Sequence, residues 1–304
     1  MSLTSDSPTL YKTSGLMRTA RKRAGLSQVE VAQHLGVSQG ALSKLENGIL
    51  VPNAPQWFQF CDLTSISPDS LASGYLETLR PISDEIHELE QGYRLEKRYL
   101  QHRSSKVRTL LPWINYLKHH LGETKVEALC DRLKIDNDIF LDYDFQVSLE
   151  LLLDLLVEAS TLGLLTKDQL FELRRVLILP RNHGSISEVY QASSHPAERL
   201  ERLIENSSLY ERNFHYSLES VAGKNPRQTL MIKPALTLAE IPYRRKELGD
   251  FLCQYKRLYF SNVPVWGSKY RTDLIEKECL FHGSNRCIYE IRYQPFTRNL
   301  KAIA

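Results

Sequence analysis

The sequence contains no run of 18 or more apolar residues, so we expect no transmembrane helix. Its first residues, MSLTSDSPTLYKTSG, lack a basic cap followed by an apolar stretch, and we expect no secretory signal peptide. A large excess of one charge is also missing, because 39 Lys and Arg residues against 36 Asp and Glu residues leave a net charge of +3. These absences predict a cytoplasmic protein that does not work at a membrane.

Sequence motifs of common enzyme classes are missing as well. There is no Gly-rich phosphate-binding loop and no Gly-x-Ser-x-Gly nucleophile elbow. A His-x-Glu followed by Pro-Cys-x-x-Cys, which a zinc deaminase requires, does not occur either. We therefore expect a protein that is not an enzyme.

Cysteine is scarce, with five residues in the chain. An odd number of cysteines in a reducing compartment argues against structural disulfides. Cys253, Cys279 and Cys287 nevertheless lie within 35 residues of one another. Thiolates brought together in this way are good ligands for a metal ion such as Zn²⁺.

The length of 304 residues and the hydrophobic fraction of 42% are typical of a globular protein with about two domains. Changes in composition and in the apolar pattern predict four segments. They are a loose polar tail at 1–13, a domain of short helices at 14–76, linker or dimerisation helices at 77–121, and a domain of helices and strands at 122–304.

The predicted linker contains Arg80-Pro81, where the chain breaks because a residue before proline avoids the helical region. From Ile82 to Leu121 the sequence predicts a long helix. Glu96 interrupts its apolar stripe, so the pattern favours a helix that packs on its own domain or on a second copy over a coiled coil. The stripe consists of Ile82, Ile86, Leu89, Tyr93 and Leu100.

The C-terminal segment changes from a helical to a strand pattern at about residue 209. Before that point, Ser148 is a predicted N-cap and Pro196 lies in a predicted first turn. Thr166 and Gln169 form a further capping box. After it, stretches rich in Tyr, Phe, Ile and Val predict antiparallel strands, with one helix near 243–257. The fold class that we expect is multidomain, an all-α domain followed by an α+β domain.

Two short helices joined by a tight turn are predicted at residues 27–46. Ser27 can cap the first helix, with Glu30 closing the capping box, and Ser38 can cap the second. Gly36 permits the turn between them, which other residues would strain. Such a pair can present its second helix to the major groove of DNA. The apolar residues expected on the inner faces are Val29, Val31, Ala32, Leu35, Ala41, Leu42 and Leu45.

Four basic residues lie between positions 18 and 23, directly before this pair of helices. A charge cluster of this kind is either a solvated face or a surface that attracts DNA phosphates. The cluster consists of Arg18, Arg21, Lys22 and Arg23.

Spaced residues of this region match a known type of DNA-binding domain. They are Arg21, Gly25-Leu26-Ser27-Gln28, Ala32, Leu35-Gly36-Val37-Ser38, Ser43 and Glu46-Asn47-Gly48. With them, residues 14–72 resemble the lambda-repressor and Cro type of helix-turn-helix, also called the xenobiotic-response-element family. The alternative is a helical hairpin that only packs.

The resemblance implies roles for particular residues. Arg21 pairs with Glu46, and Gln28 reaches a phosphate of double-stranded DNA. Because a single helix-turn-helix covers little DNA, we expect a homodimer on a palindromic operator. The residues placed at or near the groove are Ser38, Gln39, Gly40, Ser43 and Lys44.

Trp57 and Phe58 depart from this family, whose members usually carry smaller residues at this point. The two aromatic residues are either part of the core or part of a surface that meets the C-terminal domain or a second subunit.

The segment EKECLFHGSNRCIYEIRY predicts a β-hairpin with His-Gly-Ser-Asn as its turn. Alternation places Cys279 and Ile275 on one face of the first strand and Cys287 on one face of the returning strand. The two cysteines therefore point the same way beside the turn, and Cys253 offers a third sulfur.

The spacing Cys253-x22-Glu276-x2-Cys279-x7-Cys287 is similar to that of a known sensor domain. It resembles the small-molecule-binding domain shared by 4-vinyl reductases and aromatic-responsive enhancer-binding activators. The resemblance covers residues 253–293 and implies a structural zinc ion held by these four residues, beside an apolar and aromatic pocket. Four protein ligands leave no open position, so such an ion would hold structure and do no chemistry.

Two features leave the ligand set open. Strict alternation puts Glu276 on the face opposite Cys279, so Glu276 binds only if the strand is irregular. His282 is a competing ligand by its spacing. The alternatives to a zinc site are inert buried thiols and a redox-active pair.

Tyr255, Tyr259, Phe260 and Trp266 lie close in sequence to this site, either as core residues or as the lining of an effector pocket. Together these patterns predict a transcriptional regulator whose operator binding is modulated by a small molecule sensed in the C-terminal domain. The alternative function is a DNA-bound scaffold whose C-terminal domain recruits a protein partner without binding a small ligand.

Overall fold

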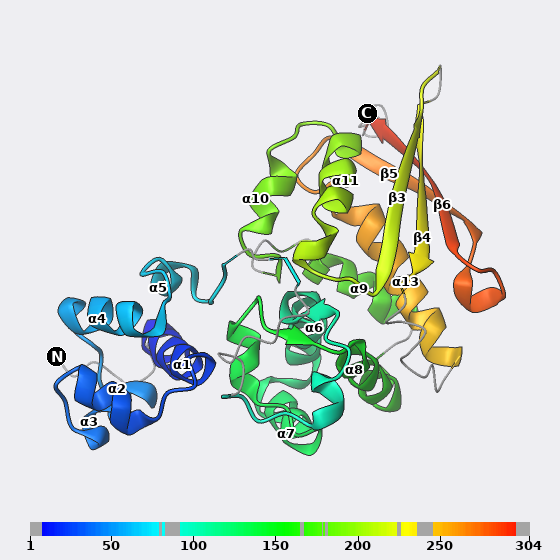
Figure 1. Ribbon diagram of the computed structural model, residues 1–304. Helices are drawn as coiled ribbons and strands as arrows, with labels where there is room; N and C mark the ends of the chain where they lie inside the picture. Colours follow the sequence, from blue (N-terminus) through cyan, green and yellow to red (C-terminus); the bar gives the residue numbers. More distant parts are fainter. Residues whose placement is uncertain are drawn as a thin grey trace, which may run out of the picture.

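The computed structural model places a small helical head and a larger body side by side (Figure 1). We call residues 8–76 the head and residues 92–295 the body. No helix in the described part of the chain combines the length and apolarity needed to cross a membrane. The structure describes residues 8–78, 81–82, 92–164, 167–177, 179, 182–223, 226–235 and 246–295.

The head is all-α, as expected. Its helices are α1 (Pro8–Arg23), α2 (Gln28–His34), α3 (Gln39–Glu46), α4 (Ala54–Thr64) and α5 (Ser70–Ser73). They enclose one apolar core, whose fully or nearly fully buried members include Leu16, Met17, Val31, Leu42, Leu45, Trp57 and Phe60.

One residue predicted for the inner face of the head lies outside instead. Val29 is 62% exposed. The inward face of α2 carries Val31, Ala32 and Leu35. Val29 lies two positions before Val31, and residues two apart on a helix do not share a face.

The predicted long helix from residue 82 to residue 121 is wrong wherever the structure describes it before residue 111. Tyr93 and Tyr99 are buried in the body, and the chain then pairs with another strand, so tertiary packing overrides the local helical pattern. Ile86 and Leu89 lie outside the described residues. The observed elements are η2 (Lys97–Leu100), β1 (Ser105–Lys106), η3 (Val107–Thr109) and α6 (Leu111–Leu121).

The first part of the body is helical. Ser148 caps α8 by accepting a hydrogen bond from the Glu150 amide, and α11 begins at Pro196, as predicted. Thr166 lies outside the described residues. The elements are α7 (Glu123–Arg132), η4 (Asn137–Leu141), β2 (Gln146–Val147), α8 (Leu149–Thr161), α9 (Lys167–Leu177), α10 (Ile186–Gln191), α11 (Pro196–Glu205) and η6 (Ser207–Leu209).

The second part of the body is an antiparallel sheet, which confirms the α+β class. Its four strands follow the order β3-β4-β6-β5 and stand at one end of the body in Figure 1. The long helix α13 packs on the sheet through Cys253, which contacts Cys287 of β6. The elements are β3 (Phe214–Val221), β4 (Arg227–Pro234), α13 (Lys246–Asn262), β5 (Tyr270–Glu278), η7 (Leu280–His282) and β6 (Cys287–Pro295).

Head and body are joined by backbone pairing as well as by side chains. Leu76, which belongs to the core of the head, donates its amide to the Leu141 carbonyl at 2.7 Å. Its own carbonyl accepts from the Tyr143 amide at 2.9 Å. The end of the head is therefore fixed to the segment between η4 and β2.

Candidate DNA interface, cysteine cluster and cavity

The caps of α2 and α3 form as the sequence predicts. Ser27 Oγ accepts from the Glu30 amide at 3.2 Å, and Glu30 Oε2 accepts from the Ser27 amide at 2.7 Å. Ser38 Oγ accepts from the Ala41 amide and begins α3. Gly36 has a φ of +64°, in the left-handed region that favours glycine. Local sequence thus sets the angle between the two helices.

Arg21 and Glu46 are brought together inside the head. Arg21 Nε donates to Glu46 Oε1 at 2.6 Å and Nη2 donates to Oε2 at 3.0 Å, while Nη1 donates to the Leu26 carbonyl. Glu46 is buried. The bidentate pair ties α1 to the end of α3, where the resemblance implied it.

The buried pair also orients the residues expected at the groove. Gln28 Nε2 donates to Glu46 Oε2 at 2.9 Å, and Gln28 Oε1 accepts from Gln39 Nε2 at 2.7 Å. Gln39 at the start of α3 is thus held by a chain of hydrogen bonds that ends in the core of the head. Ser38, Gly40 and Lys44 are exposed as well, and Ser43 is half-buried.

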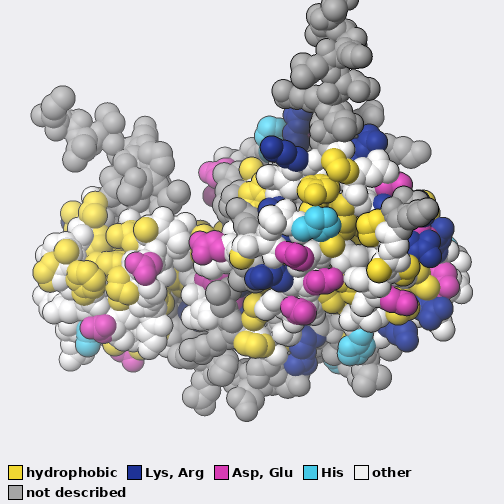
Figure 2. All heavy atoms as spheres, turned by 90° about the horizontal axis from the view of Figure 1, so that it is seen from above, with side chains coloured by type: hydrophobic (Ala, Val, Ile, Leu, Met, Phe, Trp, Pro, Cys, Tyr) yellow, Lys and Arg dark blue, Asp and Glu magenta, His cyan; other side chains and the backbone are white. Residues whose placement is uncertain are grey.

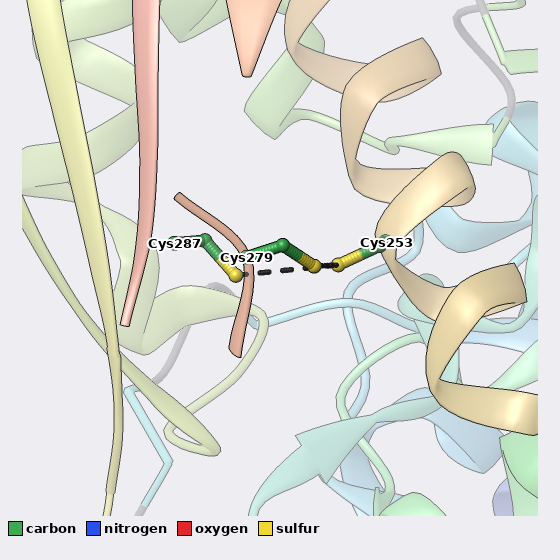
Figure 3. Close-up of side chains that lie close together, drawn as sticks. All are labelled: Cys253, Cys279 and Cys287. Carbon is green, nitrogen blue, oxygen red and sulfur yellow. Dashed lines mark hydrogen bonds between the residues drawn. The ribbon is translucent and has the colours of Figure 1, made fainter. Parts of the chain in front are cut away.

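Three cysteines from separate elements converge in the body (Figure 3). Cys253 comes from α13, Cys279 follows β5, and Cys287 begins β6. Cys253 Sγ lies 3.2 Å from Cys279 Sγ and 4.0 Å from Cys287 Sγ, and all three sulfurs lie within 4.8 Å of one another. Around a tetrahedral zinc ion with sulfur at about 2.3 Å, neighbouring sulfurs are about 3.8 Å apart. The cluster therefore fits the donor set and spacing of a zinc site.

The first strand of the hairpin contains the irregularity that Glu276 requires. Glu276 pairs with Tyr289, whereas Glu278 already pairs with Ile288, so Lys277 is an extra residue in β5. This bulge puts Glu276 and Cys279 on the same side of the sheet. Glu276 Oε1 is buried and has no hydrogen-bond partner among the described residues, which suits a metal ligand.

The same register corrects the predicted face of Ile275, which is 42% exposed because it points away from the cysteines. Glu276 lies outside the close group formed by the three sulfurs, and its Oε2 is 3.7 Å from Arg257 Nη1. Its binding to an ion would need a rotation of the side chain. His282 is exposed and is not part of the close group either.

The environment of the cluster favours a thiolate at Cys287. Hydrogen bonding with Cys253 lowers the pKa of Cys287 to about 6, and the Leu280 amide donates to its sulfur at 3.3 Å. The same contact, together with burial, raises the pKa of Cys253. The thiolate is the form of cysteine that binds a metal.

A cavity of about 60 Å³, measured as the space that the centre of a water molecule can reach, lies inside the body. Tyr255, Tyr259 and Phe260 of α13 line it, as the pocket hypothesis required, whereas Trp266 does not. The other lining residues are Ser105, Arg108, Thr109, Pro112, Leu149, Leu152, Asn182, His183, Ile186, Tyr190, Tyr210, Glu211, Leu252 and Lys256.

Most of the polar lining is missed by sequence reasoning, because it comes from four distant segments and forms no contiguous motif. Lys256 Nζ donates to Glu211 Oε1 at 3.0 Å, so these two charges neutralise each other. Burial lowers the pKa of His183 to about 4, and the ring is neutral at physiological pH. Arg108 is also buried and ion-paired.

Comparison with protein families identifies the head. The model of the helix-turn-helix domain matches residues 14–73. The chain carries a helix-turn-helix domain. No curated protein matches the chain.

Solved structures similar to the chain include two H-NOX proteins. One, from S. oneidensis in the Fe(II)NO ligation state, is 12% identical with a TM-score of 0.46 and covers 62% of this chain and 99% of its own. The other, unliganded and from K. algicida, is 11% identical with a TM-score of 0.45 and covers 64% of this chain and 98% of its own. Similarity at this level supports no assignment for the body.

Three of the four residues of the basic cluster, Arg18, Lys22 and Arg23, contact carboxylates of the body. Arg18 binds Asp138 through two hydrogen bonds, of 2.7 and 2.8 Å. Lys22 Nζ lies 2.6 Å from Asp136 and 2.8 Å from Asp138. Burial alone would raise the pKa of Asp138, but Arg18 and Lys22 lower it below its ordinary value. Arg18 and Lys22 therefore form an interdomain contact, which neither sequence-based alternative included, whereas Arg21 pairs inside the head.

The two aromatic residues of α4 have different positions. Trp57 is 5% exposed, stacks on Phe60 and donates its Nε1 hydrogen to the Pro68 carbonyl. Phe58 is 55% exposed. Trp57 is thus a core residue of the helix-turn-helix domain, and Phe58 is a surface residue.

Proposed function

We propose that this protein is a transcriptional regulator that binds a double-stranded DNA operator through α3 and senses a small molecule in the body. The observation that carries the DNA-binding part is the Glu46–Gln28–Gln39 chain of hydrogen bonds in a matched helix-turn-helix domain. Glutamine can bond adenine through two hydrogen bonds, and a pre-oriented side chain loses less entropy when it does so.

The cavity supports the sensing part of the proposal, because a fully packed interior would favour a scaffold. It is lined mainly by aromatic and aliphatic side chains with a few polar groups, as small-molecule sites usually are. The helix α13 supplies Tyr255, Tyr259 and Phe260 to the cavity and Cys253 to the cysteine cluster. A structural zinc ion bound to the three cysteines and Glu276 would fasten this wall of the cavity to the β5–β6 hairpin.

An apolar surface on the head supports a homodimer. Six of the nine large hydrophobic residues that are exposed in the described part of the chain belong to the head, and Figure 2 shows hydrophobic side chains gathered on that part. Ile49, Leu50 and Val51 follow α3 directly. Pairing of two heads next to α3 would bring two recognition helices to the half-sites of a palindromic operator.

Selection of duplexes from a random pool, followed by fluorescence anisotropy with the selected and a scrambled duplex, tests the function. We expect Gln39→Ala and Ser43→Ala to weaken binding to the selected duplex by about tenfold and binding to the scrambled duplex much less. Gln59→Ala, an exposed position on α4, is the matched control and keeps both affinities. Equal losses on both duplexes would remove Gln39 and Ser43 from the base-reading set.

A further inference from the structure

Arg108 connects the cavity to the segment that leads to the DNA-binding head. It lines the cavity, is 3% exposed, and donates from Nη1 to Glu77 Oε1 at 2.6 Å and from Nη2 to Asp144 Oδ1 at 2.8 Å. Its Nε is buried without a hydrogen-bond partner among the described residues. Leaving a buried donor unpaired is unfavourable, so Nε would gain from one more acceptor.

Glu77 belongs to the linker. It follows Leu76, whose backbone pairs with residues 141 and 143 of the body and whose side chain lies in the core of the head. Its second oxygen accepts from the Ser185 amide at 2.7 Å, just before α10. A Cβ at Gly184 would lie 2.7 Å from both carboxylate oxygens of Glu77, so only glycine lets the backbone approach this carboxylate so closely.

The size and charge of the cavity restrict its ligand. Its volume of about 60 Å³ is smaller than the about 150 Å³ of an apolar cavity that holds benzene, so a ring enters only where a neighbouring side chain moves out. The charges that line or adjoin it are balanced, since Lys256 pairs with Glu211, while Arg108 and Lys106 together pair with Glu77 and Asp144. An added anion is therefore accommodated only if it replaces one of these carboxylates.

We propose that the cavity takes a small organic carboxylate with a single ring or short apolar body, and that this carboxylate replaces Glu77 on Arg108. The proposal rests on the sensing function proposed above. The exchange keeps the charge of Arg108 compensated, supplies an acceptor for Nε, and places the apolar body against Leu149, Leu152 and Phe260. Glu77 is the group that leaves, because it lies on the linker, whereas Asp144 is also held by Lys106.

Release of Glu77 would loosen the linker. The Ser185 amide and Arg108 would lose the linker carboxylate. The linker would keep its backbone pairing through Leu76 and the hydrogen bonds of Thr78 to Asp144. Ligand binding and the seating of Glu77 then oppose each other, and each weakens the other by the same factor. How firmly the linker is held on the body then depends on the occupancy of the cavity.

Calorimetric titration of the full-length chain with benzoate, phenylacetate and hexanoate, each beside its uncharged amide, tests the proposal. We expect at least one carboxylate to bind at least tenfold more tightly than its amide. Glu77→Gln should strengthen that binding by about tenfold, because the competing group then carries no charge. Glu219→Gln, an exposed position on β3, is the matched control and should leave the affinity unchanged.

Hydrogen exchange of the unaltered chain provides a second measurement that does not depend on a variant. Saturating carboxylate should speed the exchange of residues 76–78 and of the Ser185 amide. Amides that bind as tightly as the acids, no binding by any of the acids at millimolar concentration, or unchanged exchange at the linker would each overturn the proposal. Duplex binding without added carboxylate is measured separately, so loss of the regulator function itself would be recognised as a different failure.

Discussion

The head and the body assemble their candidate sites over different distances along the chain. Gln28, Gln39 and Glu46 lie within 19 residues, and their contacts follow from two caps and one turn. Arg108 binds residues 31 and 36 positions away and touches the carbonyl of His183, 75 positions away. The difference teaches that a spaced motif describes the head, whereas the body's cavity exists only once distant segments have packed.

The largest effect is expected at the cysteine cluster. It is the one candidate site of the body whose residues the sequence already indicates by their spacing. Cys279→Ser should lose the zinc ion that we propose for this site and lower the free energy of unfolding of the body by about 4 kcal/mol or more, because loss of a structural metal is among the most destabilising changes. Metal analysis and thermal unfolding measure both. Cys130→Ala, at a buried thiol of α7, is the control and should keep its zinc. A Cys279→Ser protein that retains its zinc would show that the ligand assignment is wrong.

In the head, the largest effect is expected at the buried ion pair. Glu46→Gln leaves Arg21 without its counter-ion, and we expect the free energy of unfolding of the head to fall by about 3 kcal/mol. Glu30→Gln, at an exposed cap, is the control and should lower the stability of the head much less. Urea unfolding followed by hydrogen exchange of α1 and α3 distinguishes the head from the body. Equal stability of the two variants would mean that the Arg21–Glu46 pair contributes little to the stability of the head.

The sequence could therefore predict the parts of the molecule that rest on local chemistry. The caps at Ser27, Ser38 and Ser148 formed, and the spacing of the cysteines brought the three sulfurs together. The apolar pattern of residues 82–121 gave a wrong prediction, because such a pattern does not show which surface of the body the chain packs against. Tyr93, for example, belongs to no helix in the structure, because it packs in the core of the body.

For the basic cluster, too, the sequence did not identify the binding partner. Arg18 and Lys22 carry charges that suit DNA phosphates equally well, and only the fold shows that Asp136 and Asp138 bind them. Arg108 could not be selected from the sequence, since no neighbouring residue marks it as part of a cavity. Its role depends on Glu77 and Asp144, which belong to other segments.

The buried charges of the body predict a dependence of stability on pH. Burial alone would raise the pKa of Asp144, but Arg108 and Lys106 lower it to about 2. A carboxylate whose pKa is lower in the folded chain stabilises it above its ordinary pKa, and that contribution is lost as the pH falls from about 4 to about 2. We expect it to be about 2 kcal/mol.

Unfolding measured in urea between pH 7 and pH 2 tests this dependence. Asp144→Asn should be less stable than the unaltered chain at pH 7, and its stability should fall by less below pH 4. Asp273→Asn, at an exposed position of β5, should follow the profile of the unaltered chain. Parallel profiles for Asp144→Asn and the unaltered chain would contradict the assignment of the lowered pKa.

The smallest effect is expected at the exposed end of the head. Lys44 is exposed on α3 and is expected to meet a phosphate or a base edge. Lys44→Ala should lower the slope of log K against log salt by about one unit if it contacts a phosphate. Lys125→Ala, at an exposed position of α7 in the body, should leave the slope unchanged. A loss of slope in both variants would show that the effect comes from net charge alone.

The account depends most directly on DNA binding by the whole chain. Fluorescence anisotropy with duplexes of random and selected sequence, over a series of salt concentrations, measures it. We predict binding at low ionic strength and a linear fall of log K with log salt, because bound cations are released from the phosphates. A purified chain that binds no duplex of any sequence at low ionic strength would contradict the regulatory function.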